Sequence, residues 1–344
     1  MKAIVFHEHG GNEVLRFEDV PEPQVAYGQV KVKIHASALN HLDIWVRGGL
    51  PGPKIPMPHI LGNEMAGEIA ELGDGVDGWN VGDRVVVSPG MGCGVCDHCL
   101  DGYDSACDHY KMHGYTLQGG WCEYQAVDAR RLIKITDRWS MEEWASAPLV
   151  FITAWHMLFT RTTVRPGEDV LVHAAGSGVG IAAIQLARLA GARVITTAGS
   201  DGKIAKALEL GAEHGINYKT HDFAKEVMKL TGGKGADIVV DHVGTDTFEG
   251  NLRCLAKRGR LVTCGATTGA EASFNMRFLF VRQLSIVGSY MGGFVELRKA
   301  MELMGRGQLK PVVDSVFPLE KAAEALQRME ERKQFGKIVL NITK

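Results

Sequence analysis

The stretch DVLVHAAGSGVGIAAIQLARLAG, residues 169–191, decides how the second half of this chain folds. Its first part, DVLVHAA, is an apolar run of the length that buried strands have. A glycine-containing turn follows, and GIAAIQLARLAG then has the pattern of a helix that stops at a glycine. A strand, a tight turn and a helix in direct succession predict the beginning of a βαβ unit.

Strand-like and helix-like segments alternate on the C-terminal side of this stretch. Strands that alternate with helices pair in parallel and form a sheet that is covered on both faces. The sequence therefore predicts an α/β domain with a doubly wound parallel sheet. The predicted strands are 193–198, 214–218, 236–243, 259–266 and 284–290, and the predicted helices are 203–212 and 223–233.

The glycine-containing turn, AAGSGVG at residues 174–180, has the position of a phosphate-binding turn. Backbone N–H groups at the start of a helix attract pyrophosphate, and glycine lets the phosphate approach the backbone closely. Counted back from Gly180, Ser177 and Ala175 hold two places that glycines hold in the G-x-G-x-x-G pattern. The turn predicts a dinucleotide-binding domain, and a merely tight strand-to-helix turn is the alternative. The predicted cofactor contacts here are Ser177, Gly178, Val179 and Gly180.

The end of the second strand bears on which nicotinamide cofactor binds. NAD enzymes place an acidic residue there, which holds both ribose hydroxyls. In this chain the strand ends in TTAGSDGK, with Gly199 at its tip and Ser200 and Lys203 just beyond. A hydroxyl and a lysine suit a 2′-phosphate, so we favour NADPH. Asp201, which could reach the ribose, argues for NAD, and Lys203 could be only an exposed residue of a first helical turn.

The two ends of the chain have a different pattern. The first 130 residues contain short β-like runs between glycine turns, such as 30–37 and 82–89, and predict a mainly β domain. The pattern of apolar residues changes near Ser140, and residues 141–159 have a helical pattern. The last 50 residues mix helices with strand-like segments and do not extend the alternating series. We expect them to fold back and complete the first domain.

Composition excludes several classes of function. The chain has 344 residues, of which 45% are hydrophobic, and a formal net charge of −2, as in a soluble protein of two domains. Without a basic surplus it is not expected to bind nucleic acid or an anionic membrane. Its first residues, MKAIVFHEHGG, do not form a signal peptide, and no window of about 18 apolar residues predicts a membrane span. We therefore expect a cytoplasmic protein.

Four of the seven cysteines lie close together, in the order Cys93-x2-Cys96-x2-Cys99-x7-Cys107. Four thiolates at this spacing can enclose one tetrahedral Zn²⁺ in a tight loop. An Fe–S cluster and reduced thiols without metal are the alternatives. A site with four thiolates has no open position for a substrate, so the predicted zinc is structural and stabilises a lobe over residues 90–110.

These motifs together resemble the medium-chain dehydrogenase/reductase family over the whole chain. The shared segments are GDRVVV, the four-cysteine lobe, GSGVG, KALELGA, VVDHVG, RLVTCG, IVGSY and FGKIVLNI. The resemblance implies a GroES-like, mainly β domain built from residues 1–151 and 294–344. It implies a Rossmann domain over residues 152–293.

The resemblance adds cofactor contacts to those read from the turn. Lys203 and Tyr218 match positions that contact the 2′-phosphate of NADPH in the quinone oxidoreductase branch of the family. Val243, in VVDHVG, and Gly265, in RLVTCG, are expected at the cofactor as well.

Zinc alcohol dehydrogenases of the family hold a second, catalytic zinc. The places of its ligands are matched here by Asn40 in ASALNHLD, by Asn63 in LGNEMAG and by Leu149 in APLVF. Amide and alkyl groups bind zinc poorly, so a catalytic zinc is not expected. Asn40 and the HLD that follows it are similar to the quinone oxidoreductase branch, although many of those proteins lack the cysteine lobe.

A relocated metal is the alternative to a site without catalytic zinc. His41, His59 and Glu64 lie near the substrate cleft by homology and could supply its ligands.

Without a Lewis acid, the acceptor itself has to disperse the developing negative charge. A quinone or an α,β-unsaturated carbonyl does so by conjugation, and hydrogen-bond donors can stabilise the resulting enolate. We therefore predict hydride transfer from NADPH to such an acceptor. Asn40 is the candidate to orient the carbonyl or the nicotinamide, and Asn63 the residue that fills the vacated ligand position. Asp43 is expected to position the ribose or relay a proton, or else to be an ordinary helix-cap carboxylate.

Two other functions are open at this stage: an alcohol dehydrogenase with an unusual metal site, and a non-enzymatic NADPH sensor or structural protein. The expected partner is a small-molecule substrate. The resemblance implies a homodimer or homotetramer, in which LSIVGSYMGG, residues 284–293, could join two Rossmann sheets.

Overall fold

The computed structural model describes residues 1–343. The chain divides into two compact units, which are described separately below. The first unit comprises Met1–Leu149 and the chain from Gly293 onward, and the second comprises Val150–Gly292. Among the described residues no helix has the length and apolar character that a bilayer-spanning helix requires.

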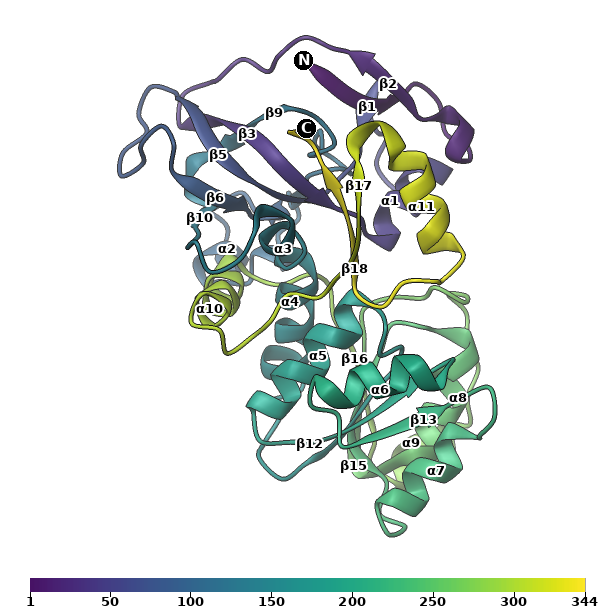
Figure 1. Cartoon of the computed structure of the whole chain (residues 1–344). Helices are drawn as coiled ribbons and strands as arrows, with labels where there is room; N and C mark the ends of the chain where they lie inside the picture. The colour runs from purple at the N-terminus through teal and green to yellow at the C-terminus, as the bar shows by residue number, and fades with distance from the viewer. Residues whose placement is uncertain (344) are drawn as a thin grey trace. The chain divides into compact units, whose positions relative to one another are not determined.

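The second unit is built on one parallel sheet of six strands (Figure 1). The strand order is β13-β12-β11-β14-β15-β16, so the chain starts in the middle of the sheet and winds outward in both directions. This order confirms the predicted doubly wound Rossmann fold. The strands are β11 (Asp169–Val172), β12 (Arg193–Ala198), β13 (His214–Asn217), β14 (Ala236–Asp241), β15 (Leu255–Thr263) and β16 (Ser285–Gly288).

The helices of this unit connect the strands. Two of them, α8 and α9, were not predicted from the sequence; α8 has a glycine in its middle and a weak apolar periodicity. A Cβ on Gly250 would come within 2.4 Å of the Phe223 ring, so the glycine is needed where α8 packs on α7. The helices are α5 (Gly178–Leu189), α6 (Asp201–Glu209), α7 (Phe223–Leu230), α8 (Thr245–Cys254), α9 (Met276–Val281) and the π-helical segment η4 (His156–Arg161).

Residues 141–159 do not form the single helical segment that their pattern suggested. They form α3 (Met141–Ala145), α4 (Pro148–Trp155) and the beginning of η4. Pro148 starts a new helix because its fixed φ suits a first helical position and its missing N–H would have no partner there. The boundary between the two units, after Leu149, falls within the first turn of α4.

The first unit is mainly β. Its largest sheet has the order β10-β6-β5-β3-β18-β17, with β9 also paired to β3, and a smaller sheet has the order β2-β1-β4. The strands are β1 (Lys2–Phe6), β2 (Arg16–Asp19), β3 (Gln29–Ala38), β4 (His59–Ile60), β5 (Glu64–Leu72), β6 (Arg84–Val87), β7 (Gly90–Met91), β8 (Lys111–Met112), β9 (Tyr124–Asp128), β10 (Leu132–Lys134), β17 (Val313–Pro318) and β18 (Lys337–Asn341). Its other helices are α1 (His41–Gly48), α2 (Asp97–Leu100), α10 (Phe294–Gly305) and α11 (Ala322–Glu330).

The C-terminal segment closes this unit. Strand β18 pairs antiparallel with β3, with Val339 opposite Ala38, and Figure 1 shows the yellow C-terminal strands beside the purple N-terminal ones. Apolar side chains from both ends of the chain therefore share one core, which includes Phe6, Ile34, Met65, Trp121 and Leu340.

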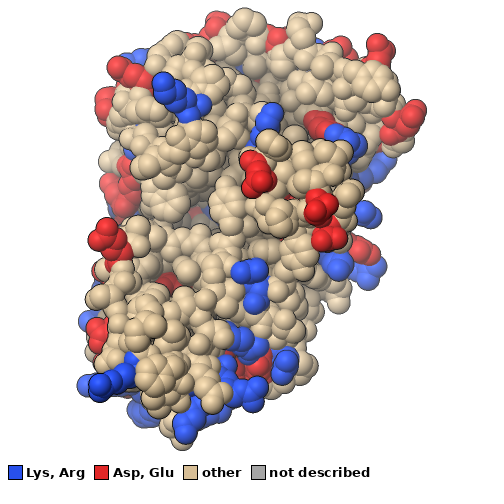
Figure 2. All heavy atoms as spheres, turned by 180° about the vertical axis from the view of Figure 1, so that it is seen from behind, with Lys and Arg blue, Asp and Glu red and all other residues tan. Residues whose placement is uncertain are grey.

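The second unit has a positive formal net charge, although the net charge of the whole chain is slightly negative. Residues 150–292 contain sixteen Lys and Arg against twelve Asp and Glu. Figure 2 shows Lys and Arg side chains spread over the surface of this unit. A local surplus of cations favours an anionic ligand such as a dinucleotide.

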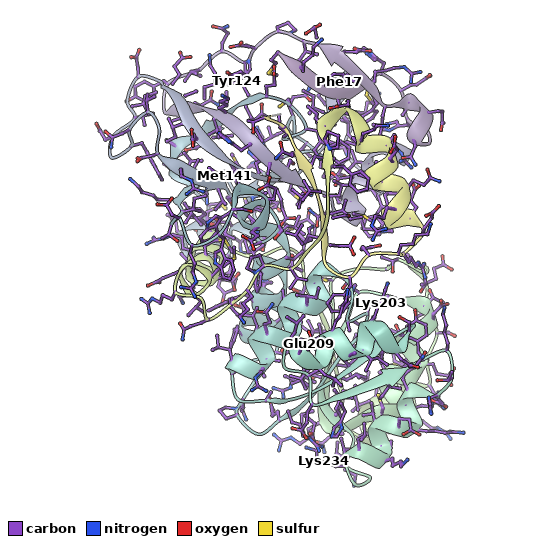
Figure 3. The ribbon with its side chains drawn as sticks, viewed as in Figure 1. Phe17, Tyr124, Met141, Lys203, Glu209 and Lys234 are labelled. Atoms are coloured by element: carbon purple, nitrogen blue, oxygen red, sulfur yellow. The ribbon has the colours of Figure 1, made fainter. Side chains whose placement is uncertain are left out.

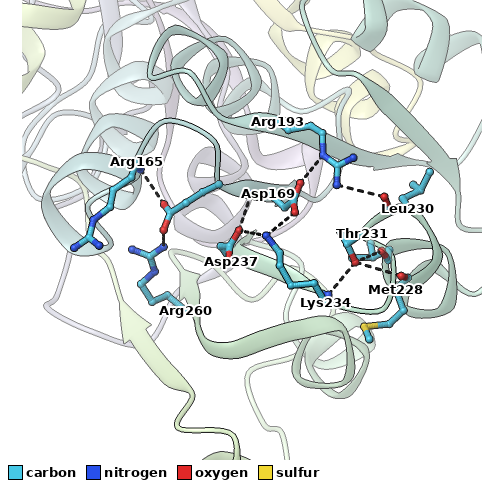
Figure 4. Close-up of polar contacts among 12 residues, drawn as sticks. Arg165, Asp169, Arg193, Met228, Leu230, Thr231, Lys234, Asp237 and Arg260 are labelled. Atoms are coloured by element: carbon cyan, nitrogen blue, oxygen red, sulfur yellow. Dashed lines mark hydrogen bonds and ion pairs between the residues drawn. The ribbon is translucent and has the colours of Figure 1, made fainter.

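An ion-pair network holds the amino ends of the central strands together (Figure 4). Asp169, the first residue of β11, contacts Arg193 of β12, and its other carboxylate oxygen lies 2.7 Å from Lys234 Nζ. Lys234 also contacts Asp237 at 2.7 Å. Burial alone would raise the pKa of Asp169, but hydrogen bonds from Arg193 and Lys234 outweigh it and lower the pKa.

We expect Asp169→Asn to lower the free energy of unfolding at pH 7 by about 1–3 kcal/mol, because a partly buried charge pair is lost. The lowered pKa means that this stabilisation is present above the ordinary pKa of an aspartate and is lost as the pH falls through the pKa of the folded state. Urea unfolding at pH 7 and near pH 3 measures both effects. The control is Asp137→Asn, since Asp137 is 94% exposed although it pairs with Arg84. Equal losses in the two variants would contradict the expectation.

Candidate active site and metal centre

The turn that was predicted to bind phosphate joins β11 to α5. Ser177 caps α5, and its Oγ accepts the Gly180 N–H at 2.9 Å. The Ser177 hydroxyl also lies 2.8 Å from Nε2 of His242, at the end of β14. A Cβ on Gly180 would come within 2.4 Å of the Ala174 carbonyl oxygen, so only glycine fits there. The four turn residues predicted to contact the cofactor therefore lie together at the amino end of a twelve-residue helix.

The residues predicted at the adenosine ribose gather between β12 and α6. Ser200 caps α6 with its Oγ on the Lys203 N–H at 3.4 Å, and Figure 3 shows where Lys203 lies. A Cβ on Gly199 would come within 2.6 Å of the Tyr218 hydroxyl, so Tyr218 lies directly against this glycine. Cε of Lys219 would lie 3.4 Å from the same Cβ on Gly199. Lys219 was not among the predicted cofactor contacts, although it directly follows Tyr218.

Asp201 was the argument for NAD at this position. In the structure its Oδ1 accepts a hydrogen bond of 2.8 Å from the Asn217 amide. One oxygen of the only carboxylate expected near the ribose is therefore already engaged.

Val243 and Gly265 lie at the carboxyl ends of the neighbouring strands β14 and β15. The Val243 N–H donates to Asp241 Oδ1 at 2.7 Å. A Cβ on Gly265 would lie 3.2 Å from the His242 carbonyl oxygen, so the two loops are in contact. All predicted cofactor contacts therefore lie along the carboxyl edge of one parallel sheet, where open α/β sheets bind ligands.

A buried cluster of amide and charged side chains occupies the first unit. Asn40 precedes α1, Asn63 precedes β5, Glu64 begins β5 and Lys337 begins β18. Lys337 and Glu64 are 6% and 0% exposed, and Nζ lies 2.7 Å from Oε2. Removing one member of a buried pair leaves the other charge uncompensated, so each depends on its partner.

This ion pair sets the orientation of both asparagine amides. Lys337 can only donate, so the Asn40 atom that faces Nζ is Oδ1. The Asn40 amide nitrogen then donates to Asn63 Oδ1 at 2.7 Å and to Glu64 Oε2 at 2.9 Å. The Asn63 amide nitrogen is buried and has no hydrogen-bond partner among residues 1–343. Asn40 thus has no amide hydrogen left to donate to a substrate carbonyl, and the available donor belongs to Asn63.

Asp43 acts as a helix-cap carboxylate, the alternative weighed from the sequence. Its Oδ2 accepts the Asn40 N–H at 2.7 Å, and its Oδ1 accepts the Gly62 N–H at 3.1 Å. Burial raises the pKa of Asp43 to about 7, although both backbone hydrogen bonds favour the charged form. Asp43 therefore fixes the backbone on either side of the amide cluster.

The donor set does not fit a cation in this cluster. Glu64 Oε1 accepts the Leu149 N–H at 2.6 Å and its Oε2 faces Lys337. The Lys337 ammonium also donates to Leu39 O and Asn40 Oδ1, so all three of its hydrogens have acceptors. A second cation would meet this positive charge and oxygens that are already hydrogen-bonded.

The two histidines considered for a relocated metal have other contacts. His41 packs edge-on against Trp45, with ring centroids 4.8 Å apart, and His59 packs against Phe6 at 5.6 Å. Burial lowers the pKa of His59 to about 4. Within residues 1–343, Cys93, Cys96, Cys99 and Cys107 are the one group of metal-binding side chains found close enough together to hold an ion.

The four cysteines fit a tetrahedral metal. Their sulfur atoms lie within 4.8 Å of one another, and four sulfurs at the usual Zn–S distance of about 2.3 Å would be about 3.8 Å apart. The backbone nitrogens of Cys93 and His109 each lie 3.3 Å from Cys107 Sγ and donate hydrogen bonds to it. The lobe contains the short helix α2, where the sequence suggested a loop without helix. It is joined to the rest of its unit by the ion pair of Asp104 with Arg131 at 2.6 Å.

Lys337 was not predicted as part of this cluster, and Glu64 was considered only as a possible ligand of a relocated metal. The signal available was a lysine within the apolar segment FGKIVLNI, since a lysine is rarely buried without an acidic partner. The partner could not be named, because about 270 residues separate it from Lys337 in the chain.

Comparisons with known proteins agree with this architecture. A family model described as alcohol dehydrogenase GroES-like domain matches residues 26–137, and one described as zinc-binding dehydrogenase matches residues 178–306. A solved structure of an NAD-dependent alcohol dehydrogenase is 47% identical with a TM-score of 0.97, over 99% of this chain and 100% of that one.

Curated relatives have several different names. The 2-haloacrylate reductase of Burkholderia sp is 32% identical over 98% of both chains. The quinone oxidoreductase of Homo sapiens is 30% identical over 94% of this chain and 92% of its own. Other relatives of similar identity are named alcohol dehydrogenases. The chain therefore belongs to the medium-chain dehydrogenase/reductase family of zinc-type alcohol dehydrogenase-like proteins and is an oxidoreductase.

Proposed function

We propose that this protein is an NADPH-dependent reductase that transfers hydride to a quinone or an α,β-unsaturated carbonyl without a catalytic metal. The observation that carries the proposal is the buried cluster of Asn40, Asn63, Glu64 and Lys337. Beside the Lys337–Glu64 ion pair it leaves one amide donor, that of Asn63, without a partner among residues 1–343, where the family resemblance places a catalytic zinc. The Cys93 cluster would hold one Zn²⁺, whose role is to stabilise the lobe.

The cluster supplies a hydrogen bond in place of a Lewis acid. Lys337 polarises the Asn40 amide, which donates to Asn63 Oδ1 and so leaves the Asn63 N–H as the donor for the acceptor oxygen. Because Asn63 is buried, the oxygen has to enter the vacated ligand position to receive this bond. One donor stabilises a developing enolate by about 3 kcal/mol, which suits an acceptor that disperses charge by conjugation.

The remaining predicted site residues take positioning roles in this proposal. Asn40 holds Asn63, and Asp43 holds the backbone at Asn40 and Gly62. The proton that completes the reduction comes from water, so no strongly basic side chain is required. The names of two relatives, quinone oxidoreductase and 2-haloacrylate reductase, denote conjugated acceptors and support this class of substrate.

We further propose NADPH rather than NADH. The Ser200 hydroxyl, the Tyr218 hydroxyl and the ammonium groups of Lys203 and Lys219 suit a 2′-phosphate. The contact of Asp201 with Asn217 supports the same choice, because a carboxylate free to bind both ribose hydroxyls would favour NAD.

We also propose that the protein forms a homodimer or a homotetramer. Strand β16 is an edge strand of the Rossmann sheet, so one side of its backbone is open to another strand. Exposed apolar side chains lie on this strand and on α9, which precedes it: Met276, Phe278, Phe280, Val281 and Ile286. Pairing of two copies through β16 would cover them.

The second candidate is an NAD-dependent alcohol dehydrogenase. The 47% identity to a solved protein of that name is the observation that favours it.

A panel of quinones, enones, enoyl thioesters and simple alcohols, each tested with NADPH and NADH, separates the two candidates. We expect turnover of conjugated acceptors with NADPH, unaffected by prior treatment with a chelator of accessible metal. Metal analysis should find one zinc per chain. Chelator-sensitive oxidation of an unconjugated alcohol, with two zincs per chain, would establish the second candidate instead. Tight binding of NADPH without turnover of any acceptor would indicate a sensor.

We expect Asn63→Asp to lower kcat for a quinone about 10²-fold, because the change keeps the side-chain size and removes the donor. Asn63→Leu should do the same, with KM for NADPH unchanged in both. NADPH binding and the unfolding temperature identify variants that have lost the fold. Full turnover by a folded Asn63→Leu variant would exclude a role for this amide.

We expect Lys203→Met to weaken NADPH binding about tenfold or more and to leave NADH binding unchanged, because only NADPH has the 2′-phosphate. Lys206→Met, one turn further along α6, is the matched control. Dissociation constants for both nucleotides, measured by fluorescence titration, test the difference. A parallel loss for NADH would show that Lys203 does not read the 2′-phosphate.

A further inference from the structure

A buried chain of polar side chains joins the carboxyl ends of three strands below the phosphate turn. His173 directly follows β11, Thr197 lies near the end of β12, and Asp241 is the last residue of β14. Asn251, in α8, completes the chain. Each of the four side chains is at most 1% exposed.

The hydrogen bonds of this chain have one consistent direction. Asp241 Oδ2 accepts from the Asn251 amide nitrogen at 2.9 Å, which turns Asn251 Oδ1 toward His173. His173 Nε2 lies 2.6 Å from this oxygen, so Nε2 carries the proton.

The other ring nitrogen of His173 is therefore an acceptor. His173 Nδ1 accepts the Thr197 hydroxyl at 2.9 Å. The imidazole is thus neutral and held at both nitrogens, and burial lowers its pKa, which agrees with that state. The Phe223 ring packs edge-on against it, with centroids 4.8 Å apart.

The residue next to His173 has an unfavourable backbone conformation. Ala174 has a φ of 51°, in the left-handed region that non-glycine residues seldom occupy. Such a conformation is strained and persists only where neighbouring contacts impose it.

Thr197 and Ser177 supply contacts that hold Ala174 in this conformation. The Ala174 N–H donates to Thr197 Oγ1 at 3.4 Å, and its carbonyl accepts the Ser177 N–H at 2.9 Å. This turn of the backbone directs the chain from β11 into the start of α5, where the phosphate-binding N–H groups lie.

We propose that His173 is a positioning residue for the dinucleotide. With Thr197 and Asn251 it locks the left-handed turn at Ala174 and so presents the backbone N–H groups of residues 177–180 to the pyrophosphate. No contact of His173 with the cofactor is required. The proposal rests on the proposed use of a nicotinamide dinucleotide, but it applies equally to NADPH and NADH.

The test compares nucleotide affinity in variants that lose one or both of the hydrogen bonds made by the His173 ring. His173→Leu should weaken binding of NADPH and of NADH by the same factor, about tenfold or more, because the turn loses its alignment. His173→Gln can still donate to Asn251 and should bind more tightly than the Leu variant. Thr197→Val removes only the hydroxyl and should weaken binding of both nucleotides even if the Leu variant does not fold. His221→Leu, at an exposed histidine of the same unit, is the control.

The outcomes separate this inference from the proposed function. If the unaltered protein binds no nicotinamide nucleotide, both the proposed function and the inference about His173 are wrong. Wild-type affinity in folded His173→Leu and Thr197→Val variants, with only a lower unfolding temperature, would show that the chain of side chains is merely structural and would overturn the inference. A loss restricted to NADPH would also overturn it, because the pyrophosphate is common to both nucleotides.

Discussion

The buried ion pair of Lys337 and Glu64 is the interaction on which the first unit and its site depend. It joins a strand from the end of the chain to a strand from the beginning, with Nζ and Oε2 2.7 Å apart and almost no exposure. Neither charge could remain buried without the other. Since Lys337 can only donate, the pair also determines which way the Asn40 amide points and, through it, which way Asn63 points.

This arrangement explains how one family fold can accommodate different reactions. The relatives include proteins named alcohol dehydrogenase, quinone oxidoreductase and 2-haloacrylate reductase, all at about one-third identity or somewhat below over nearly the whole chain. A shared fold therefore says little about the substrate, which depends on the side chains of the site. In this chain those side chains are two amides, a leucine and a buried lysine–glutamate ion pair, and we propose that they accommodate an oxygen that accepts a hydrogen bond rather than a metal ion.

The Rossmann unit uses a related principle at its phosphate turn. Its glycine pattern is incomplete, yet Ser177 caps α5, and a Cβ on Gly180 would come within 2.4 Å of the Ala174 carbonyl oxygen, so the turn is tight there. Buried polar side chains below the turn hold the strained residue Ala174. We propose that these polar groups orient the backbone groups that would bind the nucleotide.

Local patterns in the sequence were sufficient for the doubly wound sheet, the glycine-containing turn that opens α5 and the cluster of four cysteines. These signals are local: strand and helix periodicities, a glycine turn before a helix and closely spaced thiols each involve only a few neighbouring residues. They can therefore be recognised without a structure. Packing in three dimensions was needed for the rest. The close approach of Gly250 in α8 to the Phe223 ring is a tertiary contact, and the direction of the Asn40 amide depends on Lys337, almost 300 residues away. Hydrogen-bond direction is a property of atoms brought together by folding, and no spacing along the chain records it.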